Sequence, residues 1–163
     1  MPRKNPGARL RATEDTNMAY ANLLYHIVFG TKGRLPMIRS EIRPEFYSYM
    51  CGIVRGLGAV VIEIGGIEDH IHLLIKLKPT TNVADFVRDL KSNSSAWMKE
   101  NGVRKFAWQR RYGAFTVSES QKGIVTRYIL NQERHHKKFD FKTEFETFLK
   151  SNGISIDDYV WQE

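Results

Sequence analysis

The sequence is poor in cysteine: Cys51 is the only one among its 163 residues. A single cysteine excludes an internal disulfide and a metal cluster held by several thiolates, and it favours the reducing cytosol. No apolar run reaches the roughly 18 residues that a membrane-spanning helix requires, and the sequence has no secretory signal pattern. A glycine-rich phosphate loop is also absent, so we expect no nucleotide cofactor. We therefore expect a cytoplasmic protein without a membrane span.

Acidic residues are fewer than basic ones: the sequence has 18 Asp and Glu and 25 Lys and Arg, which gives a net charge of +7 at pH 7. This balance favours a phosphate-rich partner only mildly, since many ordinary proteins are basic. Residues 1–17 are polar and lack apolar periodicity, so we expect a flexible basic arm there. We expect residues 18–163 to form a single domain, since 42% apolar residues can supply a core.

Apolar periodicity predicts an α+β fold. Alternation over two faces and short apolar runs predict strands at residues 24–29, 59–64, 70–77 and 113–117. Helical spacing predicts helices at residues 39–56, 82–99, 118–136 and 143–150. The glycines before residue 70 indicate a hairpin between the second and third strands. The order predicts a ferredoxin-like β-α-β-β-α-β unit, with an antiparallel sheet, helices on one face and an added C-terminal helix.

Two histidines open the third predicted strand, whose sequence from residue 69 is DHIHLLIKL. Side chains alternate along a strand, so His70 and His72 share one face while Ile71 and Leu73 share the other. Their α carbons lie about 7 Å apart, which lets two imidazoles converge on one metal ion. The same pattern also suits two polar residues on a half-exposed strand.

A tyrosine and a glutamine lie four residues apart in the segment KGIVTRYILNQERHHKK. This spacing places Tyr128 and Gln132 on one face of a helix, where a hydroxyl and an amide oxygen are presented together. Ser118 and Gln121 form a capping-box pattern that predicts the start of this helix. The alternative is a tyrosine packed between helix and sheet, with a solvated glutamine.

Together these features resemble the single-tyrosine transposases of small bacterial insertion sequences, which belong to the His-hydrophobic-His endonuclease superfamily. The resemblance rests on three motifs in the family's order and spacing: YHIVFGTKGR in the first strand, His70-Ile71-His72 after a glycine-bearing turn, and Tyr128-Ile129-Leu130-Asn131-Gln132. It spans roughly residues 20 to 136.

The resemblance implies a function and a set of partners. It implies cleavage and rejoining of single-stranded DNA through a 5′-phosphotyrosine, at element ends marked by hairpins. It also implies a homodimer with merged sheets, in which each active site combines the histidines of one protomer with the tyrosine helix of the other. Under this resemblance Tyr128 is the nucleophile, and His70, His72 and Gln132 are the metal ligands.

The chemistry of phosphodiester cleavage agrees with these roles. A tyrosine hydroxyl with a pKa near 10 is a poor nucleophile at neutral pH, and the phosphodiester it must attack is anionic. A divalent cation would offset that negative charge. Nitrogen and oxygen ligands without thiolate point to Mg²⁺ or Mn²⁺, although zinc, nickel or cobalt would also bind. No general base for Tyr128 is evident in the sequence.

Other polar residues near these motifs have more than one interpretation. We expect His135 and His136 to lie at a helix end beside Lys137 and Lys138 and not to bind metal. Asp69 or Glu68 would either orient a histidine or form the turn. We expect His26 to be a satisfied histidine on the sheet.

Basic residues interleave with aromatic ones in RKFAWQRRYGAF, a composition suited to single-stranded DNA. The candidate phosphate contacts are Lys32, Arg34, Lys91, Arg104, Lys105, Arg110 and Arg111, together with Arg3, Lys4, Arg9 and Arg11 of the arm. A solvated surface is the alternative for each of them.

The sequence thus predicts a DNA transposase, or a relative that performs the same chemistry at dispersed chromosomal repeats. The alternative is a catalytically silent basic module that binds structured single-stranded DNA or RNA. Composition does not separate the two, whereas a metal site aligned with a tyrosine favours the enzyme.

Overall fold

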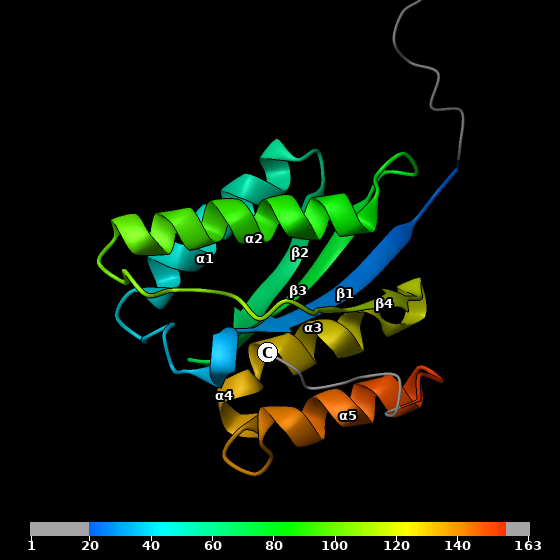
Figure 1. Ribbon diagram of the computed structural model, residues 1–163. Helices are drawn as coiled ribbons and strands as arrows, with labels where there is room; N and C mark the ends of the chain where they lie inside the picture. Colours follow the sequence, from blue (N-terminus) through cyan, green and yellow to red (C-terminus); the bar gives the residue numbers. More distant parts are fainter. Residues whose placement is uncertain (1–19, 156–163) are drawn as a thin grey trace, which may run out of the picture.

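The computed structural model describes residues 20–155, which form one antiparallel sheet with helices on both faces (Figure 1). The strands are β1 (Leu23–Gly30), β2 (Val60–Gly66), β3 (His70–Leu77) and β4 (Gly113–Val117), in the order β2-β3-β1-β4. The longer helices are α1 (Arg43–Gly56), α2 (Val83–Glu100), α3 (Lys122–Leu130), α4 (Gln132–His135) and α5 (Phe141–Ser151). The predicted arm, and the apolar residues from Ile156 onward, lie outside the described range.

The central strands β1 and β3 owe their burial to alternating apolar side chains. Ile27 and Phe29 of β1 and Ile71 and Leu73 of β3 point to the face that α1 and α2 cover, where they are fully buried. The register pairs Ile27 with Leu73 and Phe29 with Ile71. Because the side-chain period of a strand is two, this register sends the residues between them to the opposite face.

Helices α1 and α2 close the apolar face with residues at helical spacing. Phe46, Met50 and Val54 of α1 are fully buried against the sheet. The start of α2 is capped by Asn82, whose side chain accepts a hydrogen bond from the backbone N–H of Asp85 at 3.1 Å. The main core therefore lies between these two helices and the sheet.

Helices α3, α4 and α5 lie on the other face (Figure 1). A second apolar cluster forms there from Val28, Phe115, Phe141, Phe145 and Leu149, three of which come from α5. Gly65 lets α3 approach β2 closely, because a Cβ at this position would lie 2.5 Å from the carbonyl oxygen of Ile129. Residues distant in the sequence thus meet on this face.

The predicted α+β ferredoxin-like fold is confirmed, and each predicted strand and helix has a counterpart. The expected placement of the helices on one face is corrected, because α3 and α4 lie with α5 on the face opposite α1 and α2, where Gly65 lets α3 pack on β2 (Figure 1). The helix expected over residues 118–136 differs, because it begins as a short 3-10 turn at Glu119–Gln121 and is interrupted at Asn131 between α3 and α4. The capping box is absent, since the Ser118 hydroxyl bonds to that of Ser120 at 3.0 Å. Among the described helices, none is long and apolar enough to cross a membrane.

Candidate active site

Three buried histidines project from the sheet face that α3, α4 and α5 cover. His26 comes from β1, and His70 and His72 come from β3, whose register pairs His72 with Val28. Nε2 of His26 and Nδ1 of His72 form a hydrogen bond of 2.8 Å, which fixes the orientation of both rings. Burial lowers the pKa of His26 to about 4. His26 is therefore the satisfied sheet histidine that was expected.

The ring of His70 is oriented by its neighbour in sequence. Nδ1 of His70 lies 2.7 Å from Oδ1 of Asp69, and the other carboxylate oxygen of Asp69 lies 3.7 Å from Arg34. Burial alone would raise the pKa of Asp69, but the hydrogen bond and charge of His70, with Arg34, hold it below its usual value. Of the two predicted carboxylates, Asp69 orients the histidine, while Glu68 lies 3.7 Å from Arg43.

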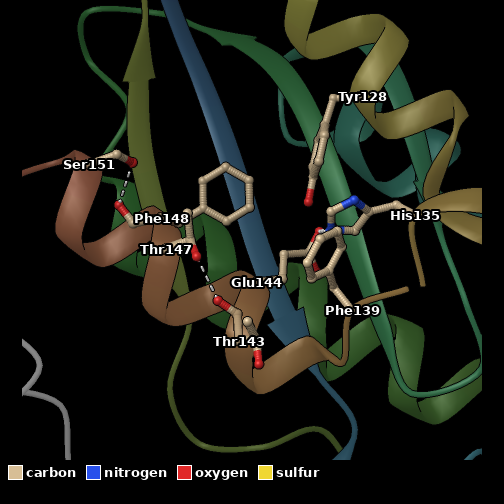
Figure 2. Close-up of a pocket in the computed structure, with 8 residues that line it drawn as sticks. All are labelled: Tyr128, His135, Phe139, Thr143, Glu144, Thr147, Phe148 and Ser151. Carbon is tan, nitrogen blue, oxygen red and sulfur yellow. Dashed lines mark hydrogen bonds and ion pairs between the residues drawn. The ribbon is translucent and has the colours of Figure 1, made fainter. Parts of the chain in front are cut away.

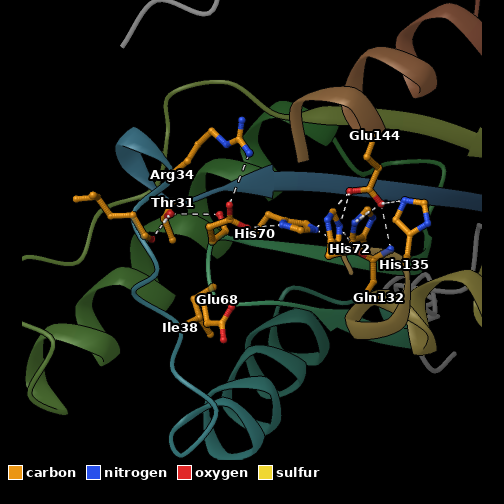
Figure 3. Close-up of polar contacts among 12 residues, drawn as sticks. Thr31, Arg34, Ile38, Glu68, His70, His72, Gln132, His135 and Glu144 are labelled. Atoms are coloured by element: carbon orange, nitrogen blue, oxygen red, sulfur yellow. Dashed lines mark hydrogen bonds and ion pairs between the residues drawn. The ribbon is translucent and has the colours of Figure 1, made fainter. Parts of the chain in front are cut away.

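Gln132 brings a further polar group to the histidines of β3 (Figure 3), and His136 lies next to it. Oε1 of Gln132 lies 3.0 Å from Nε2 of His70 and 3.1 Å from Nε2 of His136. Nδ1 of His136 donates to the carbonyl oxygen of Phe139 at 2.7 Å. Burial, with the charges of neighbouring histidines, lowers the pKa of His136 to about 4.

These hydrogen bonds determine which nitrogens carry protons. An imidazole in its neutral form has one N–H, and in that form of His70 and of His136 the proton lies on Nδ1, held by Asp69 and by the carbonyl of Phe139. Nε2 of each ring is then a bare acceptor that faces Oε1 of Gln132, another acceptor. Acceptors that face one another across about 3 Å repel unless a proton or a cation lies between them.

Glu144 of α5 adds a carboxyl group to the same cluster. Its Oε1 accepts a hydrogen bond from Nε2 of Gln132 at 3.0 Å and lies 3.3 Å from Nε2 of His72. Its Oε2 lies 3.0 Å from Nε2 of His136 and 3.5 Å from Nε2 of His70. Burial, with the charge of Asp69, raises the pKa of Glu144 to about 8.

Tyr128 of α3 lies beside the cluster, with its ring centroid 5.6 Å from that of His72 and 5.2 Å from that of His135. Its hydroxyl points into a cavity of about 330 Å³ between α3 and α5 (Figure 2). The cavity is lined by Tyr128, His135, Phe139, Thr143, Glu144, Thr147, Phe148 and Ser151. The Tyr128 hydroxyl is buried and has no hydrogen-bond partner among the described residues.

The residues of this cluster fit a divalent cation. One ligand atom from each of His70, His72, His136 and Glu144 lies within 4.8 Å of the others. Within residues 20–155, Nε2 of His72 and Oε2 of Glu144 are buried without a hydrogen bond, like the hydroxyl of Tyr128. Unsatisfied buried polar atoms are rare, and their convergence on one point, with only nitrogen and oxygen donors, is typical of a metal site.

Comparison with known proteins agrees with this geometry. The sequence profile of the family described as "Transposase IS200 like" matches residues 19–132, which is more than half of the chain. The chain belongs to this family.

Two curated members of the family show how far the similarity extends. The transposase for insertion sequence element IS200 of Salmonella typhimurium is 32% identical over 123 residues, covering 71% of this chain and 80% of that protein. The ISDra2 transposase TnpA of Deinococcus radiodurans is 29% identical over 117 residues, covering 68% of this chain and 84% of that protein.

Solved structures share the fold of this IS200-like chain. A crystal structure of a Deinococcus radiodurans protein assigned as a transposase gives a TM-score of 0.60 at 24% identity, over 74% of this chain and 98% of that one. A REP-associated tyrosine transposase bound to a REP hairpin gives a TM-score of 0.57 at 12% identity, over 76% of this chain and 74% of that one.

The structure brings together Tyr128, His70, His72 and Gln132, the residues singled out in the sequence. In this chain α3 packs on β2 at Gly65, which brings Tyr128 beside the histidines of β3. The resemblance implied an active site shared between protomers. A single chain does not test that expectation, and it stays a prediction.

The predicted DNA contacts have different surroundings. Lys32, Arg104, Lys105, Arg110 and Arg111 are exposed. The turn that carries Lys32 joins the segment before Arg110, since its backbone N–H donates to the carbonyl of Ala107 at 2.8 Å. Arg34 is partly buried against Asp69 and the Phe141 ring. The turn that carries Lys32 thus lies beside the loop that leads to Arg110 and Arg111.

Lys91 is the exception among these candidates. Its ammonium donates to the carbonyl oxygens of Gln109, Arg110 and Arg111 at 3.0, 3.3 and 2.9 Å, and burial lowers its pKa to about 8. All three N–H groups are therefore engaged, and a phosphate contact would break these bonds. The role of Lys91 in the structure is to hold the loop that carries Arg110 and Arg111.

Sequence reasoning missed two parts of the site. Glu144 was detectable as a carboxylate on the otherwise apolar buried face of α5, between Phe141 and Phe145. A groove beside Tyr128 is lined by Arg127 of α3, Arg134 of α4 and Lys138 of the turn after α4. His136 lies at the end of α4 as expected, but its Nε2 faces the cluster.

We expect the thermal stability of the metal-free protein to fall as the pH drops from about 6.5 to 4. Burial lowers the pKa values of His26, His72 and His136, so the stability that they contribute is present above 6.5 and lost as the pH falls through their folded-state values. Glu144 acts in the opposite sense, since its contribution is present below 4.5 and lost as the pH rises through about 8. Between pH 6.5 and 4, the stability lost through the three histidines exceeds the stability gained through Glu144, so the net effect is a loss.

This prediction is checked by the midpoint of thermal unfolding, followed by circular dichroism from pH 4 to 8 in the presence of a chelator. His26→Gln removes one of the titrating groups and should make the decline below pH 6.5 shallower. A midpoint that is constant or rises as the pH falls from 6.5 to 4 would contradict the assignment of buried neutral histidines.

Proposed function

We propose that this chain is a metal-dependent single-tyrosine transposase that cleaves and rejoins single-stranded DNA, with Tyr128 as the nucleophile. The observation that carries the proposal is the hydroxyl of Tyr128, which is buried without a partner among the described residues and lies beside a cluster of converging nitrogen and oxygen acceptors. It points into a cavity that His135 and Glu144 also line, so it has both space for a substrate and a neighbouring candidate metal site. Membership of the IS200-like family supports the same function.

The proposed metal ligands are His70, His72 and Gln132, with Mg²⁺ or Mn²⁺ as the ion. Such an ion, when bound, neutralises the phosphodiester and polarises the bond that breaks. Asp69 holds the ring of His70 with Nε2 toward the site, and His26 holds the ring of His72. Partners of this kind commonly set the orientation of metal-binding histidines.

The covalent step proposed for Tyr128 is a phosphoryl transfer that conserves one ester bond. The phenolic oxygen forms a bond to phosphorus, the bond from phosphorus to the 3′ oxygen breaks, and the tyrosine proton is balanced by protonation of that 3′ oxygen. The strand is then held as a 5′-phosphotyrosine. Attack by another 3′ hydroxyl reverses the exchange and releases Tyr128, so joining needs no nucleotide cofactor.

The proposed substrate is single-stranded DNA with hairpins, supported by a structural relative whose description includes a bound REP hairpin. The groove lined by Arg127, Arg134 and Lys138 offers cations next to Tyr128 for the phosphates of the cleaved strand. The exposed residues Lys32, Arg110 and Arg111 would contact DNA further away. Homodimerisation and a cytoplasmic location belong to the same proposal, through the family.

The experiment that tests the function is denaturing gel electrophoresis after incubation with labelled, hairpin-bearing single-stranded DNA taken from the sequence that flanks the gene. We expect a labelled protein band that survives denaturation, forms with Mg²⁺ or Mn²⁺ and disappears with a chelator. Tight binding of the same DNA without an adduct in any divalent ion would instead favour the silent binding module.

A further inference from the structure

Glu144 occupies a position where an amphipathic helix normally carries an apolar residue. It lies on the buried face of α5 with Phe141, Phe145 and Leu149, and only 4% of its surface is exposed. A buried carboxylate is costly unless it is paired or coordinates a metal. The position therefore calls for a partner that bears positive charge or a proton.

Hydrogen bonds within the protein satisfy this carboxylate only in part. Gln132 donates one hydrogen bond to Oε1, whereas Oε2 has none within the described residues. Nε2 of His136 lies 3.0 Å from Oε2, and the proton of that ring lies on Nδ1, where it binds the carbonyl of Phe139. When Glu144 is ionised, a carboxylate oxygen and a bare nitrogen thus face each other.

A cation at the centre of the cluster would satisfy both atoms at once. Bonds of about 2.1 Å to a divalent ion place neighbouring ligand atoms about 3 Å apart and opposite ones about 4.2 Å apart. The ligand atoms of His70, His72, His136 and Glu144 all lie within 4.8 Å of one another. This spread is about 0.6 Å wider than that of such a coordination shell, so small side-chain movements would bring the four atoms onto one ion.

We propose that Glu144 is an anionic ligand of the metal site, so that α5 supplies part of the coordination shell together with His136. This inference rests on the proposed function for the existence of the site at His70 and His72. Its consequence is that metal binding and the docking of α5 are coupled. Phe141 of the same helix already stacks on His70, with ring centroids 4.4 Å apart.

The test compares Glu144→Gln with wild type by calorimetric titration with Mn²⁺. Glutamine keeps the shape of the side chain and removes its charge, so we expect the fold to persist and the Mn²⁺ dissociation constant to rise at least about tenfold. Glu146→Gln is the matched control, because Glu146 lies on the same helix and faces Lys142 at 4.0 Å, away from the histidines.

A second measurement separates a ligand from a merely structural residue. Amide hydrogen exchange of α5 should slow severalfold when Mn²⁺ is added to wild type or Glu146→Gln, and should not respond to Mn²⁺ in Glu144→Gln. A structural carboxylate would alter exchange equally with and without the ion.

His70→Ala distinguishes the possible failures. If Glu144→Gln binds Mn²⁺ as tightly as wild type while His70→Ala does not, the ligand role of Glu144 is overturned and the proposed site stands. If neither variant loses affinity, the cation site lies elsewhere, and both the inference and the metal part of the proposed function fail.

Discussion

Tyr128→Phe is expected to abolish DNA cleavage, with the rate of adduct formation falling at least about 1,000-fold. The substitution removes the one oxygen that would bond to phosphorus and leaves the ring contacts with His72, His135 and Phe148 in place. The hydroxyl has no hydrogen-bond partner among residues 20–155, so its removal costs no native bond. We therefore expect unchanged folding and DNA binding within severalfold of wild type.

The measurement is single-turnover cleavage of the labelled hairpin DNA, with binding followed separately by fluorescence anisotropy. Tyr47→Phe is a matched control, because the Tyr47 hydroxyl is also buried without a hydrogen-bond partner in the described part of the chain, but belongs to α1 in the core on the other face of the sheet. Tyr47→Phe should cleave at the wild-type rate. Cleavage by Tyr128→Phe at a rate near wild type would remove Tyr128 as the nucleophile.

His70→Ala is expected to raise the dissociation constant for Mn²⁺ by about 100-fold or more, and to lower cleavage in parallel. The substitution removes a ligand nitrogen and leaves the Asp69 carboxylate without its 2.7 Å partner. His70 lies at the start of β3, and the apolar side of that strand is unchanged. The domain should therefore remain folded, which circular dichroism would check.

The control for this titration is His135→Ala. His135 is partly exposed, and its Nε2 lies 3.8 Å from Glu144, outside the group whose ligand atoms converge. Its Mn²⁺ affinity should stay within about threefold of wild type, as should that of Tyr128→Phe. Equal Mn²⁺ affinity in His70→Ala and wild type would place the cation outside this cluster.

These two predictions concern different steps and can be separated experimentally. Tyr128→Phe should retain metal binding and lose chemistry, whereas His70→Ala should lose both. Both variants should still bind hairpin DNA, because the basic residues Arg127, Arg134 and Lys138 of the groove are unchanged in each. Binding without adduct formation in both variants would show that DNA recognition is separate from cleavage.

The sequence alone determined the helices and strands of the fold. It also determined which candidate site residues share a face of their own strand or helix. Strand alternation has a period of two, so it placed His70 and His72 on the same face, opposite Ile71 and Leu73, without knowledge of neighbouring strands. Helical spacing placed Tyr128 and Gln132 toward the same side, and this relation survives the interruption of the helix at Asn131. These features depend on contacts between residues close in sequence, which local patterns encode.

Only the tertiary structure decided which residues from different elements meet at the site. Gln132 meets His70 across 62 positions, and Glu144 meets both histidines of β3 only because α5 docks on the sheet through its apolar residues. The position of Tyr128 beside His72 depends likewise on the close approach of α3 to β2 at Gly65. Such contacts are set by packing between distant elements, and no periodicity in a single segment specifies which buried polar atom will face which.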